Sequence, residues 1–346
     1  MDLVRKGFDL TYDLIKPSVF YFTQNDPKKA HEFFVSFCRH LYNSGLEKFV
    51  LDNNSNYKNP GFELSNAAGF NKDGQFHPII LKFLGFDRVV VGTVTGDFWQ
   101  GNPKSIVRFP ETSSMVNWEG LHGTGVEVVA RQLENYGDHG IPITINFMST
   151  PGKEGDELLR DQEKTIRVTR NVPYVDRYEL NISCPNTKGK DGKDERKRNL
   201  GMLDSMLCMA DENLLPHQKL GLKVSPDSTE ADVKDTLETA RNHRVNWIVT
   251  TNTTTNHNPL YILNSPGKGG ASGNAVYEDS LRVQKLYQSW IKELGLDLKL
   301  IAVGGINSPE RVQERLDYGA TGIQIYTSLV FKGPELLRGL RSHSYN

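Results

Sequence analysis

Tyr178-Glu179-Leu180-Asn181-Ile182-Ser183-Cys184-Pro185-Asn186-Thr187 is the stretch of sequence that decides the fold. Its first five residues predict a buried strand, and the proline breaks that strand. A cysteine just past the end of a strand can reach a bound ligand. The asparagines on either side of it supply both donors and acceptors, which suit a planar, amide-rich molecule.

The same unit, an apolar strand that runs into polar or glycine-rich residues, recurs from residue 60 onward. Continuous apolar runs are expected where helices cover both faces of a parallel sheet. Seven further strands are predicted at Glu63–Ala67, Arg88–Thr93, Ile143–Phe147, Leu220–Val224, Trp247–Thr251, Leu298–Val303 and Gly322–Tyr326. Helical segments such as Thr229–Asn242 and Ser280–Leu294 lie between them.

Eight strand-then-helix units predict an α/β fold, a (β/α)8 TIM barrel, whose active site lies at the carboxyl ends of the strands. A doubly wound open sheet is the alternative. No Gly-x-Gly-x-x-Gly follows the first strand, which counts against a dinucleotide-binding sheet.

Composition excludes several classes of function. A net charge of -1 and a pI near 6.8 argue against nucleic-acid binding. Three irregularly spaced cysteines fit a reducing compartment, and no Cys-x-x-Cys or His-x-x-x-His predicts a metal site. No apolar run reaches the roughly 18 residues of a membrane span, and no signal peptide is apparent. The expectation is a soluble or membrane-peripheral protein.

The first 50 residues differ from the rest and are predicted to form a helical extension, with the barrel over residues 51–346. Val4–Ile15 and Ala30–Tyr42 read as amphipathic helices, and Asp26-Pro27 is a start signal for the second. That helix is expected to place four residues on its apolar side: Phe33, Phe34, Phe37 and Leu41. The extension is either a cap on the bottom of the barrel or a separate apolar module for a lipid or hydrophobic substrate.

Two glycine-rich segments late in the chain, Gly270–Gly273 and Gly304-Gly305, predict a phosphate site. The last two βα loops of barrels often hold a phosphate with backbone N–H groups. Tyr326-Thr327-Ser328, at the end of the eighth strand, adds donors. Each glycine pair alone could instead be a tight turn.

Lys72 and Lys223 are predicted to point into the barrel mouth. A lysine among apolar neighbours is costly unless it meets an anion, although a strand-end lysine can also extend to the surface. Four loop asparagines, Asn117, Asn181, Asn186 and Asn252, could converge on a small ring such as a pyrimidine. A loop asparagine is more often a turn former. Cys184 is either an inert structural thiol or a general base.

The chain resembles the dihydroorotate dehydrogenase family from about residue 10 to residue 340. The resemblance rests on Ala67–Gly74, Gly92–Thr95 with Gly101-Asn102-Pro103, Asn181–Thr187, Leu222–Asp227, Thr251–Thr254, Gly304–Ile306 and Gln324–Thr327. It implies an FMN enzyme that oxidises dihydroorotate to orotate in pyrimidine (UMP) biosynthesis.

The resemblance also implies roles for individual residues. FMN would be held by Ala68, Gly69, Lys72, Thr93, Asn146, Asn181, Lys223, Thr251, Gly273, Gly305, Tyr326 and Thr327. Substrate would be held by Lys72, Asn117, Gly120, Leu121, Asn181, Asn186, Asn252 and Thr253. Cys184 stands where the family places its base. The quinone class normally has serine there, and cysteine is the choice of the soluble classes.

The N-terminal segment resembles the helical extension of the membrane-associated, quinone-reducing class. His31, Arg108 and Tyr326 match its quinone-facing positions. This implies a peripheral membrane protein, on the cytoplasmic face of the inner membrane if bacterial. The alternatives are a cytoplasmic enzyme that uses fumarate or another small acceptor, a related flavin enzyme acting on another pyrimidine or enone, and a flavin-binding protein that has lost catalysis.

Overall fold

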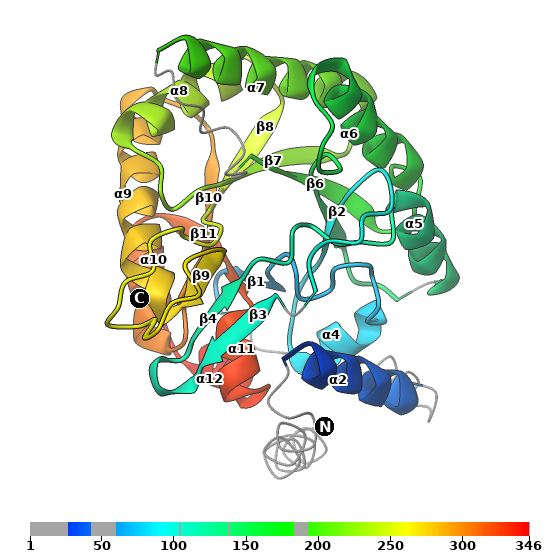
Figure 1. The fold of residues 1–346 in the computed structure, drawn as a ribbon, viewed down its shortest axis with the longest axis vertical. Helices are drawn as coiled ribbons and strands as arrows, with labels where there is room; N and C mark the ends of the chain where they lie inside the picture. Colours follow the sequence, from blue (N-terminus) through cyan, green and yellow to red (C-terminus); the bar gives the residue numbers. More distant parts are fainter. Residues whose placement is uncertain (1–26, 43–59, 104, 138, 183–192, 346) are drawn as a thin grey trace.

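The structure is a computed structural model that describes residues 27–42, 60–103, 105–137, 139–182 and 193–345 (Figure 1). Eight parallel strands form its central sheet. They are β1 (Glu63–Asn66), β2 (Val89–Val94), β5 (Ile143–Phe147), β6 (Val175–Asn181), β7 (Lys219–Val224), β8 (Val245–Thr250), β10 (Lys299–Val303) and β11 (Ala320–Ile325).

The strand order is β1-β11-β10-β8-β7-β6-β5-β2, so the first strand pairs with the last. Parallel bridges between Ser65 and Arg88 and between Asn71 and Val91 bring β1 back to β2. The sheet therefore curls into a nearly closed barrel, which confirms the predicted TIM-barrel fold. All eight predicted strands are present, and their bounds differ from the prediction by at most three residues at either end.

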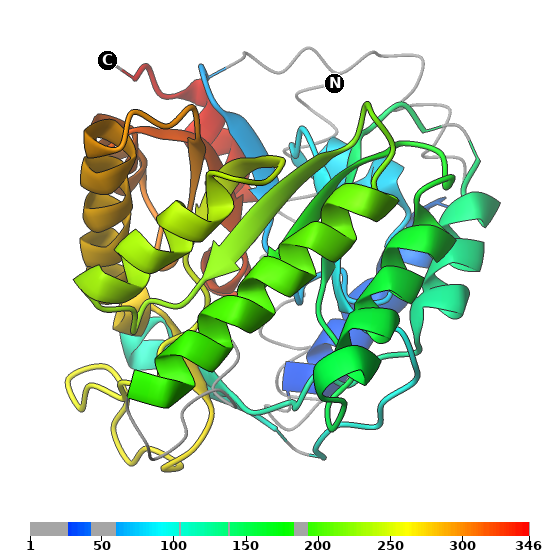
Figure 2. The same ribbon diagram turned by 90° about the horizontal axis from the view of Figure 1, so that it is seen from above.

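Helices surround the strands, because a strand that is apolar on both faces needs cover outside as well as inside. Figure 1 shows α5 to α9 around the barrel, and Figure 2 shows the strands slanting between helices. The covering helices are α4 (Pro78–Leu84), α5 (Val126–Asn135), α6 (Gly155–Thr169), α7 (Lys193–Asn213), α8 (Glu230–Ala240), α9 (Tyr277–Glu293), α10 (Pro309–Asp317), α11 (Thr327–Lys332) and α12 (Glu335–Ser342).

Local sequence explains where several helices begin. Thr229 and Asp232 form a reciprocal capping box at the start of α8. Ser308 caps α10, and Pro309 occupies its first turn. The densely charged residues 193–198 are the first turns of α7.

A second, antiparallel sheet was not predicted from the sequence. Its strands are β3 (Ile106–Phe109), β4 (Ser114–Asn117) and β9 (Gly270–Gly273), with β4 in the centre. Short 3-10 helices, Pro110–Thr112 and Asn274–Val276, adjoin it. The sheet fastens the connection after β2 to the connection after β8, over the carboxyl ends of the barrel strands.

Ion pairs bind the opposite, amino-terminal part of the barrel. The buried Arg88 guanidinium donates to both carboxylate oxygens of Asp176 (2.5 and 3.0 Å) and to Glu63 (3.1 Å). Arg177 donates to the other oxygen of Glu63 (2.7 Å). Residues at β1, β2 and β6 are thereby joined, so this end of the barrel has a structural role.

Helix α2 (Pro27–Leu41) confirms the second helix of the extension but corrects its apolar face. Val35 and Cys38 are buried and Phe34 is half-buried, whereas Phe33 is 47% exposed. The side chain of Leu41 is outside the described residues.

Helix α2 contacts β3, and the Phe34 ring lies 5.7 Å from that of Phe76, in the connection after β1. These contacts are with segments that follow the carboxyl ends of strands, and they give no support to a cap on the barrel bottom. The first predicted helix and the boundary at residue 50 lie outside the described residues. Among the described helices, none combines the length and apolar character needed to cross a bilayer.

Candidate functional site

Predicted cofactor residues from four segments lie side by side at the carboxyl ends of β2, β5 and β6. Lys72 Nζ donates to the Thr93 carbonyl (3.1 Å), and Thr93 Oγ1 donates to Asn146 Oδ1 (2.6 Å). Asn181 Nδ2 reaches Thr93 Oγ1 at 3.5 Å. All four side chains are buried. Thr93 is therefore the junction between the lysine and two amides.

Glu179 anchors this network from below and was missed by the sequence analysis. Its Oε1 accepts from Asn146 Nδ2 (2.6 Å), and its Oε2 accepts from Gln324 Nε2 (2.9 Å) on β11. A buried carboxylate is stable only when such partners are present. A signal was available in the sequence. A glutamate inside a predicted buried strand, with Asn146 and Lys223 on predicted neighbouring strands, indicates an interior polar network.

Lys223 is the opposing charge in the barrel interior. It lies on β7, in register with Asn181, and is buried. Burial lowers its pKa, and the Glu179 charge opposes that effect. Its Nζ makes no hydrogen bond to any residue that the structure describes. A buried ammonium with unused donors fits an anionic or carbonyl-bearing ligand.

The second lysine sits under the connection after β4. Burial lowers the pKa of Lys72, while the charges of Asp73 and Glu119 raise it. Asp73 Oδ1 accepts the backbone N–H of Thr124 (3.1 Å), which holds this connection in place. A Cβ on Gly123 would lie 4.0 Å from Lys72 Cε. Lys72 therefore faces both the cofactor residues and the predicted substrate loop.

The two predicted glycine segments meet, as a phosphate site requires. Gly273 has φ +77°, and a Cβ there would lie 2.2 Å from the Ser113 carbonyl oxygen. A Cβ on Gly305 would lie 2.7 Å from the Gly273 carbonyl oxygen. Thr327 Oγ1 donates to Ser272 Oγ (2.9 Å) beside them. Glycine lets these backbones approach closely, which forms a small polar cradle.

The predicted substrate residues surround the same opening. Asn252 Nδ2 donates to Asn181 Oδ1 (3.3 Å), and the Asn252 carboxamide oxygen accepts from the Thr253 N–H (2.9 Å). A Cβ on Gly269 would lie 2.4 Å from the Asn117 carbonyl oxygen, and one on Gly270 would lie 2.0 Å from Thr253 Oγ1. Asn117, Asn252 and Thr253 are thus neighbours around one short backbone segment.

Other predicted residues lie in connections that follow β1, β4 and β8. Gly120 and Leu121 have positive φ values, +67° and +61°, and form a turn in the connection after β4. Ala68 and Gly69 follow β1, where the Gly69 N–H donates to the Gly92 carbonyl (2.6 Å). Thr251 is buried at the end of β8, and its N–H donates to the Val303 carbonyl (2.9 Å).

Asp227 is a further residue that the prediction did not assign. It accepts from Thr254 Oγ1 (2.5 Å) and from the N–H and hydroxyl of Thr255 (2.9 and 2.6 Å). It therefore holds the connection after β8, which carries Asn252 and Thr253. Its position three residues after the end of a predicted strand could have indicated a role at the carboxyl end of the barrel.

An aromatic row connects the site to α2. The Tyr326 ring lies 5.7 Å from Phe70, the Phe70 ring stacks 5.3 Å from Phe76, and Phe76 lies 5.7 Å from Phe34. Burial raises the pKa of Tyr326, which keeps the phenol neutral. The row is a continuous chain of aromatic contacts between the extension and the cofactor residues.

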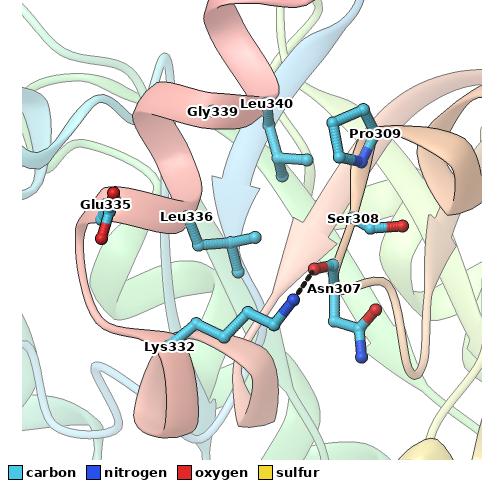
Figure 3. Close-up of a pocket in the computed structure, with 8 residues that line it drawn as sticks. All are labelled: Asn307, Ser308, Pro309, Lys332, Glu335, Leu336, Gly339 and Leu340. Atoms are coloured by element: carbon cyan, nitrogen blue, oxygen red, sulfur yellow. Dashed lines mark hydrogen bonds between the residues drawn. The ribbon is translucent and has the colours of Figure 1, made fainter.

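A cavity of about 290 Å³ lies elsewhere, between the start of α10 and α12 (Figure 3). Lys332 crosses it and donates to the Asn307 carbonyl (2.7 Å). None of its lining residues is a predicted site residue.

Comparison with known proteins identifies the family of the chain. The family model described as dihydroorotate dehydrogenase matches residues 50–342. The chain belongs to the dihydroorotate dehydrogenase family. Proteins named dihydroorotate dehydrogenase (quinone) are 31% identical in Bordetella pertussis (94% of this chain, 95% of the relative) and 30% identical in Nitratiruptor (96% and 93%).

Solved structures agree with the fold of this dihydroorotate dehydrogenase family member. The Eimeria tenella DHODH in complex with ferulenol has a TM-score of 0.76 at 22% identity, covering 92% of this chain and 90% of that one. Its ligand-free form has a TM-score of 0.72 at 23% identity, covering 86% and 92%.

Three residues to which the dihydroorotate dehydrogenase resemblance gives roles remain predictions without a described position. Cys184 and Asn186 lie outside the described residues, as does the side chain of His31. Arg108 is described, and its guanidinium lies 4.9 Å from the centroid of the Phe331 ring. Phe331 belongs to α11, which begins directly after Tyr326. Two of the three predicted quinone-facing residues therefore lie near the same helix.

Proposed function

We propose that this protein oxidises (S)-dihydroorotate to orotate in pyrimidine biosynthesis and passes the electrons to a quinone. The names of the relatives support this over nearly the whole chain. The observation that carries it is the pair of buried lysines at the carboxyl ends of the strands. Lys72 donates to the Thr93 carbonyl, and Lys223 is the register partner of Asn181. Interior ammonium groups suit a site in which negative charge develops on a bound ring.

FMN is the flavin that we propose. The residues present fit it, because the glycine cradle suits a phosphate and Lys223 has unused donors next to the amide network. Gly273, Gly305, Tyr326 and Thr327 would hold the phosphate, while Lys72, Thr93, Asn146, Asn181 and Lys223 would hold the ring. When bound, the flavin supplies the electron-accepting ring that takes a hydride from the substrate.

The protein's own residues would orient the substrate and move one proton. Asn117, Asn181, Asn186 and Asn252, with Thr253, would bind the carbonyl and N–H groups of the pyrimidine ring. Lys72 would neutralise charge between the two ligands. Cys184 would accept the proton from C5 of the substrate, and a thiol has a reference pKa low enough for this role.

The quinone would enter along α2. The aromatic row from Phe34 to Tyr326 supports this route, since apolar rings suit a hydrophobic acceptor. His31, Arg108 and Tyr326 would contact its polar head. The half-buried and exposed phenylalanines of α2 support a peripheral membrane contact at this helix.

One anaerobic experiment tests substrate, cofactor and acceptor together. The holoenzyme is mixed with dihydroorotate while flavin absorbance is followed. Bleaching, followed by recovery with a quinone but not with fumarate, is expected. Recovery with fumarate would favour the soluble-class alternative, for which the cysteine at position 184 is the supporting observation. Absence of bleaching would overturn the assignment of the substrate.

A deletion separates the acceptor from the chemistry. Removal of residues 1–50 is expected to abolish quinone reduction and to retain dye reduction. Unchanged quinone turnover would contradict the role of the extension. Because Val35 and Cys38 are buried, the folded state of the shortened protein is checked by its flavin content.

A further inference from the structure

A second cluster of reactive side chains lies on the outer helices, apart from every residue of the proposed site. Asp204 and Cys208 lie one helical turn apart on α7, and His243 follows the end of α8. These two helices pack against each other (Figure 1). One potential ligand atom from each residue lies within 4.8 Å of the others.

The histidine is held in one orientation by its neighbours. Asp211 Oδ2 lies 2.8 Å from His243 Nδ1, and Asp211 Oδ1 accepts the backbone N–H of Arg244 (3.1 Å). The Arg244 guanidinium in turn donates to carbonyls at the end of α7, including Leu214 and Leu215 (3.2 and 3.0 Å). A carboxylate on one ring nitrogen is the usual way in which a protein directs the other nitrogen toward a metal.

The other nitrogen faces a second carboxylate. His243 Nε2 lies 3.1 Å from Asp204 Oδ1. When Nδ1–H donates to Asp211, Nε2 of a neutral ring carries a lone pair, as does the carboxylate oxygen. Two lone pairs at this distance repel, so a positive charge, either a proton or a metal ion, belongs between them.

The thiol of Cys208 favours the metal ion. Tetrahedral zinc binds nitrogen, oxygen and sulfur at about 2.0–2.3 Å, which places ligand atoms roughly 3.3–3.8 Å apart. The ligand atoms of the cluster all lie within 4.8 Å of one another, so rotation of side chains is needed to bring them to these separations. The side chains of Asp204 and Cys208 are exposed and can rotate toward the ion, while that of His243 is only 7% exposed and fixed.

We propose that Asp204, Cys208 and His243 bind one divalent cation of the zinc class, with Asp211 orienting the histidine. A thiolate and an imidazole favour Zn²⁺ or Co²⁺ over Mg²⁺ or Ca²⁺. Three protein ligands leave a fourth position for water. The ion joins α7 to α8 on the outside of the barrel. Sequence patterns do not predict this site, since its ligands have no familiar spacing and only the fold brings residue 243 to residue 208.

Co²⁺ is the probe, because a thiolate ligand gives a charge-transfer absorption that other ligands do not. Co²⁺ is titrated into the holoenzyme, the Cys208→Ser variant and the His243→Asn variant, and then displaced with Zn²⁺. The wild type is expected to show one-to-one binding with the thiolate band. Cys208→Ser is expected to lose the band, and both variants to bind at least about 100-fold more weakly.

A matched control shows whether the effect is specific to the cluster. Glu238→Gln, on α8 and paired with Lys234 rather than with the cluster, is expected to bind Co²⁺ as the wild type does. Circular dichroism and flavin content verify folding, and Cys208→Ser changes only an exposed side chain. Zn²⁺ is expected to raise the melting temperature of the wild type and not that of Cys208→Ser.

Two outcomes would overturn the proposal. A thiolate band that persists in Cys208→Ser would place the metal at another cysteine. Equal Co²⁺ affinity in the wild type and in both variants would mean that a proton, not a metal, bridges His243 and Asp204.

Discussion

Asn146 Nδ2 donates a 2.6 Å hydrogen bond to Glu179 Oε1, and the two residues are also register partners on β5 and β6. This bond fixes the Asn146 carboxamide so that its oxygen faces Thr93. The Thr93 carbonyl in turn accepts a hydrogen bond from Lys72 Nζ. Glu179 therefore positions a lysine of the proposed site through two intervening residues, without reaching the opening itself.

Replacing Glu179 by glutamine is expected to lower the free energy of unfolding by about 1–3 kcal/mol. Glutamine has one acceptor oxygen, so either Asn146 or Gln324 loses its buried partner. Chemical denaturation of the purified protein measures the change. Glu163→Gln is the matched control, because its pair with the exposed Arg167 contributes no more than about 0.5 kcal/mol. Equal effects at the two positions would contradict the network.

Lys223→Met is expected to have two opposite effects. Loss of a buried charge with unused donors is expected to stabilise the apoprotein. Flavin reduction by dihydroorotate is expected to slow by about 100-fold or more, as when one stabilising donor is removed from an active site. Stopped-flow absorbance measures the rate. Lys219→Met, at the exposed start of the same strand, is expected to change neither quantity. A normal rate in Lys223→Met would remove this lysine from the mechanism.

Apoprotein stability is expected to depend on pH through Lys223. Burial lowers its folded pKa below 10.5, so between that lowered value and 10.5 the unfolded chain binds more protons than the folded one. The free energy of unfolding therefore rises with pH across this window. Subtracting the values for Lys223→Met isolates the contribution. A difference that falls as pH rises would show that the lysine gains a stable charge partner instead.

Phe34→Ala tests the aromatic row. The ring lies 5.7 Å from Phe76, so its loss interrupts the route between α2 and Tyr326. The KM for quinone is expected to rise several-fold, with flavin reduction by dihydroorotate unchanged. Phe33→Ala, the neighbouring and 47% exposed phenylalanine, is the control for the quinone step. Similar KM values in the two variants would argue against entry along this row.

Gly273→Ala tests the cradle. The added methyl group would lie 2.2 Å from the Ser113 carbonyl oxygen at a φ of +77°. We expect a loss of at least about 2 kcal/mol in stability together with reduced flavin content. Gly295→Ala has a similar φ of +63° with no atom within 4 Å, so it carries the conformational cost alone. Comparable losses in both would mean that close packing at Gly273 is unimportant.

The barrel was predictable because its strands are buried on both faces. β2 and β5 are buried at every position, and such runs are visible without any knowledge of their partners. The antiparallel sheet was not predictable in this way. Its strands are four residues long, and one is Gly-Ala-Ser-Gly. Asn117 pairs with Gly270, a residue 153 positions later in the sequence (270 − 117). Such pairing depends on the fold that brings the segments together.

The residues of the site also differ in how far the sequence alone could predict them. Lys72, Asn181 and Asn252 were predicted because they stand at strand ends, where barrels place polar groups. Glu179 and Gln324 lie within strands, so their value depends on which strands become neighbours. On α2, Phe33, Phe34 and Val35 are consecutive, so the sequence alone does not show which of these apolar residues faces the barrel. Packing against Phe76 selects Phe34 and leaves Phe33 exposed.

The pairing of β1 with β11 has a consequence for how the chain is made. Asn66 is synthesised 259 residues before its partner Ile325 (325 − 66). Until then one edge of β1 has no strand beside it, and exposed strand edges are where chains pair wrongly with one another. A nascent chain that stalls after β10 is therefore expected to aggregate through the unpaired edge of β1. Addition of β11 pairs this edge and closes the barrel on which the active site depends.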